Sequence, residues 1–201
     1  DYDAFPLRTY LAAGGTASVQ TKRGCGQKCT YCTYPLLEGR SARLRHPDDV
    51  RDDVLRAVDQ GADYFYVVDS TFNLPAPHAL AVCRSLAASS VKSRWTAYVT
   101  PLGFNPELAG AMAAAGCASV EVGSEAAVPA TLAGMGKEHS PDDILKIDRA
   151  FLAAGITPAH FFLFGGPGET EVTLEASLAL IDRLRGVSVV MIGLRVYPGT
   201  D

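Results

Sequence analysis

The feature that most constrains the fold of this chain is a regular alternation of short apolar runs with amphipathic segments. Most of the apolar runs are continuous rather than alternating, which is typical of parallel strands covered on both faces. Their spacing leaves room for a helix in each interval, since one strand–helix–strand unit takes about 30 residues. The runs predict six β-strands, at residues 16–21, 64–68, 95–99, 118–122, 160–164 and 187–196.

Helix start and stop signals lie between the predicted strands. Pro47, followed by Asp48 and Asp49, is typical of a first helical turn, and Ser140 with Asp143 forms a capping-box pattern. The signals and apolar stripes predict helices at residues 47–61, along the stripe of residues 80–87, at 140–155 and at 169–186.

Alternating strands and helices predict an α/β fold with a parallel sheet and right-handed crossovers. Six strands with intervening helices form either an open doubly wound sheet or a partial barrel. Residues 1–15, which end in two glycines, are interpreted as a loop or lead-in segment, and residues 16–201 as one domain. We expect this domain to be cut from a longer protein, because the last strand has no following helix.

Composition excludes several classes of protein. The 201 residues are 48% hydrophobic, enough for a substantial core, and the formal net charge is −4. A weakly acidic chain lacks the excess of positive charge with which proteins bind nucleic acid or an anionic membrane. No apolar run reaches the ~20 residues of a membrane span, so we predict a cytoplasmic protein with neither kind of partner. Five cysteines are too few for a disulfide-rich scaffold.

Three of the cysteines form the sharpest chemical motif. Cys25, Cys29 and Cys32 have the spacing Cys-x-x-x-Cys-x-x-Cys in a loop after the first predicted strand. Structural zinc sites usually take four ligands in paired units, and no second pair follows here. A 4Fe-4S cluster held by three cysteines leaves one iron open to an external ligand. Cys83 and Cys117 lie in apolar patterns and are interpreted as core residues.

At these residues the chain resembles the radical S-adenosylmethionine (SAM) superfamily, which has this cysteine spacing after the first strand of a partial (β/α)6, TIM-like barrel. Within the superfamily it is most similar to the subgroup that carries a cobalamin-binding domain, which includes methyltransferases and an anaerobic cyclase. The resemblance extends from about residue 16 to the end, and it is strongest at TKRGCGQKCTYCTYPLLEGR, DSTFN, GSEA, MGKEHS, GGPGET and YPGT.

The resemblance implies a role for each matching residue. Cys25, Cys29 and Cys32 would ligate the iron of a 4Fe-4S cluster. The other matching residues would contact SAM: Tyr31 near the adenine or over the cluster, Asp69, Ser70 and Thr71 at the amino group, Ser124 and Glu125 at the ribose, Lys137 at the carboxylate, and Gly166 on the adenine side.

Arg195 is a charge within the apolar run of residues 187–196. Buried arginine needs a partner, so we expect it to contact the ligand or to form an ion pair. His160, on a predicted apolar strand, is interpreted as a core histidine.

The resemblance also implies a function. A radical SAM core cleaves SAM to a 5′-deoxyadenosyl radical with an electron from a reductant such as flavodoxin or ferredoxin. The leading prediction is a cobalamin-dependent methyltransferase or related carbon-modifying enzyme that acts on a small molecule or peptide, with cobalamin held by a domain outside this chain. The alternatives are a methylthiotransferase, a non-catalytic electron-transfer module and a structural metal-bound scaffold. We expect the chain alone to lack turnover of a physiological substrate.

Overall fold

A parallel six-stranded sheet forms the centre of the protein in a computed structural model, which describes residues 5–90 and 93–200. Every pair of neighbouring strands is parallel. The strand order is β1 (Ala17–Val19), β4 (Tyr64–Val67), β5 (Arg94–Val99), β6 (Cys117–Glu125), β7 (Thr157–Phe164) and β8 (Val187–Ile192).

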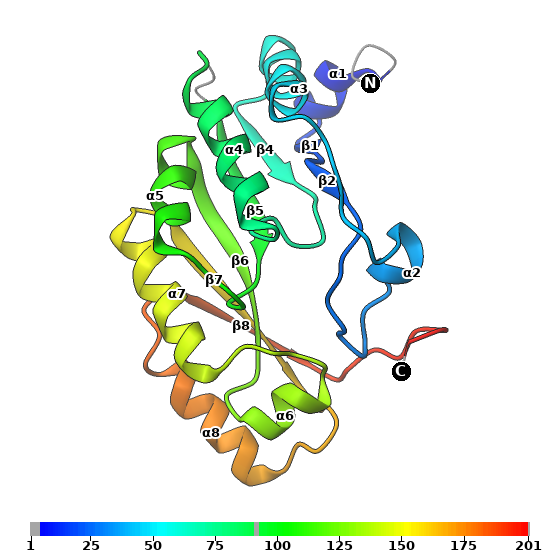
Figure 1. The fold of residues 1–201 in the computed structure, drawn as a ribbon, viewed down its shortest axis with the longest axis vertical. Coiled ribbons are helices and arrows are strands. Elements are labelled where there is room, and N and C mark those ends of the chain that lie inside the picture. Colours follow the sequence, from blue (N-terminus) through cyan, green and yellow to red (C-terminus); the bar gives the residue numbers. More distant parts are fainter. Residues whose placement is uncertain (1–4, 91–92, 201) are drawn as a thin grey trace.

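The crossover helices lie along one side of this sheet (Figure 1). The spatial order of the strands follows the chain order without a reversal, and such a reversal is what sends helices to both faces in a doubly wound sheet. The partial barrel is therefore the architecture of this chain, as predicted. The crossover helices are α3 (Pro47–Asp59), α4 (Ala76–Ala87), α5 (Pro106–Ala114), α7 (Pro141–Ala153) and α8 (Glu171–Ile181).

The main hydrophobic core lies between the sheet and these helices. Trp95 of β5 is fully buried, stacks on Phe65 of β4, and donates its indole N–H to the carbonyl of Ala115. α7 begins with the predicted capping box between Ser140 and Asp143. Cys83 and Cys117 are buried in this core, as predicted. Among the described residues, no helix is both long and apolar enough to cross a membrane.

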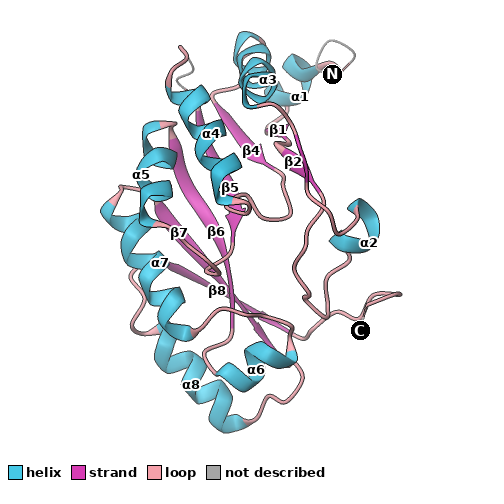
Figure 2. Ribbon diagram, in the orientation of Figure 1, coloured by secondary structure: helices cyan, strands magenta, loops and turns pink. Residues whose placement is uncertain are grey.

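The first crossover holds more structure than the sequence predicted. Between β1 and α3 the chain forms a two-stranded antiparallel ribbon, β2 (Lys22–Arg23) with β3 (Arg43–Leu44), and a short helix α2 (Tyr34–Glu38) (Figure 2). The cysteine motif lies between β2 and α2. The ribbon and α2 therefore bracket the loop that carries the three thiols.

Several predicted boundaries are wrong. The predicted strand at 16–21 ends at Val19, because the next residues turn away to hydrogen-bond with Asp69. The strand predicted at 187–196 ends at Ile192, since Gly193 has a φ of 90°. The strands predicted at 118–122 and 160–164 are longer, and the helix predicted at 169–186 spans only α8.

Besides α2 and α5, which no predicted helix range covered, two further helices lie where none was predicted. α1 (Leu7–Ala12) forms within the segment interpreted as a loop, and its Leu7, 2% exposed, belongs to the main core. Burial of the apolar Leu7 side chain stabilises the packing of this short helix against the domain. The second is α6 (Pro129–Gly134), which follows β6.

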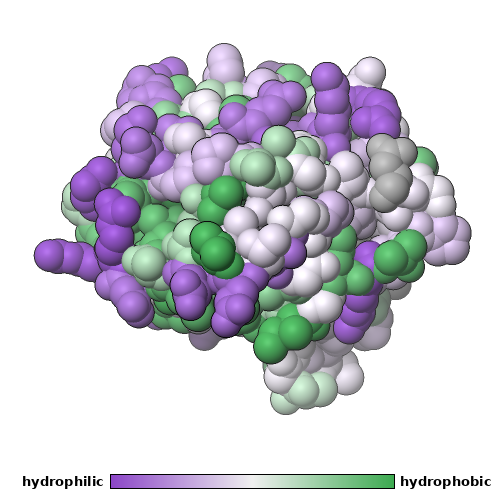
Figure 3. Space-filling view, turned by 90° about the horizontal axis from the view of Figure 1, so that it is seen from below, coloured by the Kyte–Doolittle hydropathy of each residue, from purple (hydrophilic) through white to green (hydrophobic). Residues whose placement is uncertain are grey.

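The end of the molecule formed by α6 and α8 has a mixed surface. Seen from that end, hydrophobic residues lie among hydrophilic ones (Figure 3). On α8, Val172 is 74% and Leu178 46% exposed. The apolar side chains of α8 are therefore only partly buried, with Leu180 among the buried ones.

Candidate functional site

The loop that carries the cysteines is fixed at both ends by the backbone. The amide of Cys25 donates to the carbonyl of Gly39 at 3.0 Å, and the amide of Thr30 donates to the carbonyl of Met135 at 3.2 Å. Gly24 has a φ of 92°, and a Cβ at this position would lie 2.2 Å from the carbonyl oxygen of Ser41. Only glycine fits such a close approach, so the motif needs Gly24 for the geometry of its loop.

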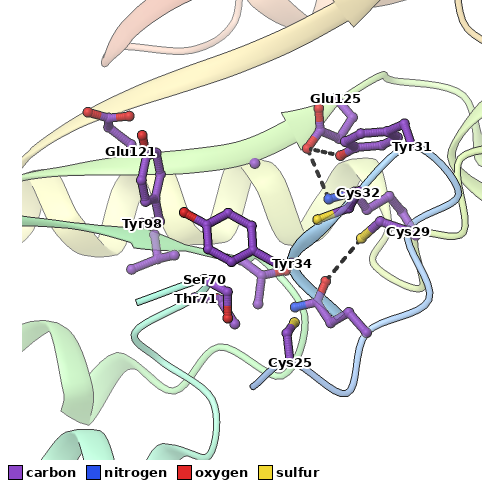
Figure 4. Close-up of a pocket in the computed structure, with 15 residues that line it drawn as sticks. Cys25, Cys29, Tyr31, Cys32, Tyr34, Ser70, Thr71, Tyr98, Glu121 and Glu125 are labelled. Atoms are coloured by element: carbon purple, nitrogen blue, oxygen red, sulfur yellow. Dashed lines mark hydrogen bonds and ion pairs between the residues drawn. The ribbon is translucent and has the colours of Figure 1, made fainter. Parts of the chain in front are cut away.

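The three cysteines line one cavity of about 220 Å³ (Figure 4). It lies at the carboxyl ends of the strands, where parallel barrels place their ligands. The cavity is lined by Cys25, Gln27, Cys29, Tyr31, Cys32, Tyr34, Ser70, Thr71, Tyr98, Val99, Thr100, Glu121, Gly123, Glu125 and Lys137.

The three thiols are free and half-buried. Burial raises the pKa of Cys29 and of Cys32 above the ordinary thiol value, while the Lys137 ammonium opposes the shift. Within residues 5–90 and 93–200, no three histidine, cysteine or acidic side chains converge closely enough to hold a single metal ion. The donor set of three thiols around one cavity fits a 4Fe-4S cluster in its chemistry, since cysteine thiolates are the ordinary ligands of such clusters.

A polar cluster of Tyr31, Glu125 and Lys137 forms part of the cavity wall, and Figure 4 shows Tyr31 and Glu125 beside Cys29 and Cys32. Glu125 accepts a hydrogen bond from the Tyr31 hydroxyl at 2.8 Å and pairs with Lys137 at 2.9 Å, both through Oε1. The Lys137 ammonium also lies 5.5 Å from the centre of the Tyr31 ring. These contacts bring together residues that are widely separated in the sequence.

Electrostatics keep the Lys137 side chain charged. Burial on its own lowers the pKa of Lys137, but the Glu125 carboxylate and the Tyr31 hydroxyl outweigh burial, so the pKa lies above its ordinary value. Burial, helped by Glu125, raises the pKa of Tyr31, which therefore stays protonated and donates to the carboxylate. A carboxylate and an ammonium, nearly removed from water, therefore face the same cavity as the thiols.

The loop after β4 contributes Ser70 and Thr71 to the cavity. This loop is held by Lys22, whose ammonium donates to the carbonyl of Thr71 and pairs with Asp69 at 2.9 Å. The side chains of Lys22 and Asp69 are 2% and 0% exposed. Asp69, expected at the ligand, thus lies behind the cavity wall and anchors the loop instead.

Three other expected site residues also lie outside this cavity. Ser124 is fully buried, and its hydroxyl hydrogen-bonds with His160. Gly166 lies against Met135, the residue that follows α6, and an added Cβ would meet the end of the Met135 side chain. Arg195 was expected inside an apolar strand, but it follows the end of β8 and is exposed.

A second cavity of about 620 Å³ adjoins the first, and six residues line both: Tyr31, Tyr34, Tyr98, Glu121, Gly123 and Glu125. The remaining wall of the second cavity is mainly apolar and aromatic and includes one charged side chain: Phe161, Leu163, Met191, Gly193, Leu194, Arg195 and Tyr197.

Sequence reasoning missed several residues of these cavities. Tyr98 and Glu121 are polar side chains within predicted apolar strands, and each lies two residues from another lining residue of its strand, Thr100 and Gly123. This period of two is the signal that could have found them, because alternate side chains of a strand point to the same face. Tyr34 and Gln27 carry no comparable signal, since they lie on irregular or short elements.

The model of the radical SAM superfamily matches residues 19–181, and the chain belongs to this superfamily. Two solved structures extend the match. The methyltransferase TsrM from Kitasatospora setae, with cobalamin and a 4Fe-4S cluster bound, is 31% identical, with a TM-score of 0.88 over 96% of this chain and 36% of that one. The cobalamin-dependent radical enzyme OxsB, at 20% identity and a TM-score of 0.77, shares the fold over 96% of this chain and 30% of its own.

Relatives known by sequence include two kinds of transferase. The tryptophan 2-C-methyltransferase of Streptomyces laurentii is 30% identical over 94% of this chain and 34% of its own length. The ribosomal protein uS12 methylthiotransferase of Desulfosudis oleivorans is 29% identical over 97% of this chain and 47% of its own. The chain thus spans between a third and a half of these relatives.

Proposed function

We propose that this chain is the SAM-cleaving core of a cobalamin-dependent methyltransferase. The observation that carries the proposal is the shared cavity, where three free thiols face a buried carboxylate–ammonium pair. The likeness to the Streptomyces methyltransferase and to TsrM supports the choice among radical SAM activities.

Cys25, Cys29 and Cys32 would hold the 4Fe-4S cluster, with a fourth iron left open for SAM. When reduced by a partner such as flavodoxin or ferredoxin, the cluster would supply the electron that breaks a carbon–sulfur bond of SAM. The protein would bind and orient SAM and exclude water from the reacting atoms.

The cluster of Tyr31, Glu125 and Lys137 would bind SAM through complementary groups. Glu125 would accept hydrogen bonds from the ribose hydroxyls, since only its Oε1 is engaged by Tyr31 and Lys137. Lys137 would pair with the SAM carboxylate, and Tyr31 would pack near the adenine. Ser70 and Thr71, which line the cavity, would lie at the amino group. Asp69 would act through the loop that it anchors.

The second cavity would take the substrate. A volume of about 620 Å³ suits a small organic molecule, and the wall is mostly apolar. Ligands of the two cavities would lie next to each other, because the two cavities share six lining residues. Cobalamin would be held outside this chain. From a protein that joins this core to a cobalamin-binding domain, we expect methylated product and S-adenosylhomocysteine when cobalamin is present. A yield indifferent to cobalamin would contradict this part of the proposal.

A methylthiotransferase is the second candidate, favoured by the 29% identity to the uS12 enzyme. The two activities differ in what is transferred. A sulfur-containing product would support the second candidate, and a product heavier only by a methyl group would support the first.

Replacing Glu125 with alanine tests the SAM site. We expect SAM affinity to fall about 10- to 150-fold, because loss of a charged hydrogen-bonding group costs roughly 1.5–3 kcal/mol. The measurement is calorimetric titration of the cluster-loaded protein with SAM.

Glu107→Ala is the matched control, because Glu107 is exposed and pairs with Arg84 on the helical side. It should bind SAM like the unaltered protein. Equal affinity in the Glu125 and Glu107 variants would place SAM elsewhere.

A further inference from the structure

β6 contains a β-bulge immediately before Glu125. Gly123 pairs with Phe161 and Glu125 pairs with Phe162, so the backbone register between β6 and β7 skips Ser124. Glu125 has a φ of 63°, and in the described part of the chain it is the one residue other than glycine with a positive φ. This conformation is unfavourable for a residue with a Cβ, and it persists only where the surroundings impose it.

A buried hydrogen-bonded chain ends at this bulge. The Ser124 hydroxyl lies 2.8 Å from Nδ1 of His160, and Nε2 of His160 lies 3.2 Å from Oδ1 of Asp148. Asp148 also accepts the backbone amides of Arg185 and Gly186, so its carboxylate is satisfied in the charged form. Because the Asp148 carboxylate can only accept, the His160 proton is assigned to Nε2, which donates to Asp148. Nδ1 of His160 is then the acceptor for the Ser124 hydroxyl.

A second histidine holds the backbone of the same residue. Nε2 of His139 lies 3.2 Å from the carbonyl oxygen of Ser124. Ser124 is therefore fixed by His160 through its side chain and by His139 through its main chain. The amide of Ala126 donates to the same carbonyl at 2.8 Å.

The order Asp148–His160–Ser124 resembles that of a nucleophilic triad, but its position excludes that chemistry. Ser124 and His160 are 0% exposed and Asp148 is 2% exposed, so no substrate reaches the hydroxyl. Burial lowers the pKa of His160 despite the nearby Asp148, which agrees with a neutral ring that bridges two partners. The hydrogen-bonded chain runs from Asp148 on α7 through His160 on β7 to Ser124 on β6. Ser124 is next in sequence to Glu125, which lines the cavity.

We propose that Asp148, His160 and Ser124 are positioning residues that fix the β6 bulge and thereby aim the Glu125 carboxylate at the SAM site. The inference rests on the proposed function, in which Glu125 contacts SAM. It differs from the ribose contact that the resemblance implies for Ser124, because here Ser124 acts only through its neighbour. The bulge sets the direction in which the Glu125 side chain leaves the strand, and Tyr31 and Lys137 meet it there.

Ser124→Ala tests this role, because it removes one oxygen atom and leaves the packing in place. We expect SAM affinity of the cluster-loaded protein to fall about three- to tenfold, the effect of one net hydrogen bond. In a Glu125→Ala background the same substitution should have no effect on affinity, since residues that act through one another are not additive. Ser93→Ala removes a buried hydroxyl remote from the cavity and should leave affinity unchanged.

A crystal structure of the Ser124→Ala protein without SAM gives an independent result. We expect the Tyr31–Glu125 hydrogen bond of 2.8 Å to be broken or the φ of residue 125 to change. An unchanged affinity, an equal loss with and without Glu125, or an unaltered Glu125 in the crystal would each overturn the inference. If the unaltered protein fails to bind SAM, the proposed function fails, and the crystal structure alone decides whether Ser124 positions Glu125.

Discussion

Replacing Cys29 with alanine is expected to abolish the stable binding of a 4Fe-4S cluster. The three cysteines line one cavity, and each would supply one of only three protein ligands to the cluster. The two thiols that remain in the variant would leave two of the four irons without a protein ligand. After anaerobic reconstitution, we expect iron to fall from about four atoms per chain to well below one. Cys25→Ala and Cys32→Ala should have the same effect.

The buried cysteines of the core are the matched controls. Cys83 is 0% and Cys117 is 6% exposed, and neither lines the cavity. Burial raises the pKa of Cys83 to about 12, so this thiol stays protonated and is a poor ligand. Cys83→Ala should therefore load iron and sulfide like the unaltered protein. Full loading of a protein lacking all three cavity cysteines would contradict the cluster assignment.

The second large effect is expected from Lys22→Met, which should destabilise the fold by about 3–5 kcal/mol. Lys22 and Asp69 form an ion pair that is almost completely buried, and removing one partner leaves an uncompensated charge in the interior. The substitution also removes the donor to the Thr71 carbonyl, so the loop that carries Ser70 and Thr71 loses its anchor. The measurement is the midpoint of urea unfolding at an unchanged slope.

Lys146→Met is the matched control for this substitution. Lys146 also pairs with an aspartate, Asp143, at 3.2 Å, but its side chain is 65% exposed. Exposed pairs contribute at most about 1 kcal/mol, so the unfolding midpoint should hardly move. Similar midpoints for the two variants would mean that the buried pair adds no more to stability than a surface pair.

The sequence was sufficient to predict the parts of the fold that depend on periodicity. α3, α4 and α7 follow their apolar stripes and caps, and the six runs of valine and aromatic residues became the six parallel strands. The choice between a doubly wound sheet and a partial barrel depends on the order of strands in space, which apolar periodicity does not encode. The ribbon of β2 and β3 is only two residues long on each side, too short for a periodic signal.

The candidate site was predictable in its residue types but not in their orientation. The cysteine spacing placed the three thiols together, and Glu125 and Lys137 meet in the same cavity. Asp69 and Ser124 follow strands in the expected way, yet each turns inward to satisfy a buried partner, Lys22 or His160. These partners are distant in the sequence, so no local sequence pattern predicts the contacts.

The central claim is that this cavity holds a three-cysteine cluster whose open iron binds SAM. Electron paramagnetic resonance of the reduced, reconstituted protein with and without SAM tests it most directly. We expect a 4Fe-4S signal whose g values change when SAM is added. A cluster signal that SAM leaves unaltered, or a protein that binds zinc in place of iron, would contradict the account.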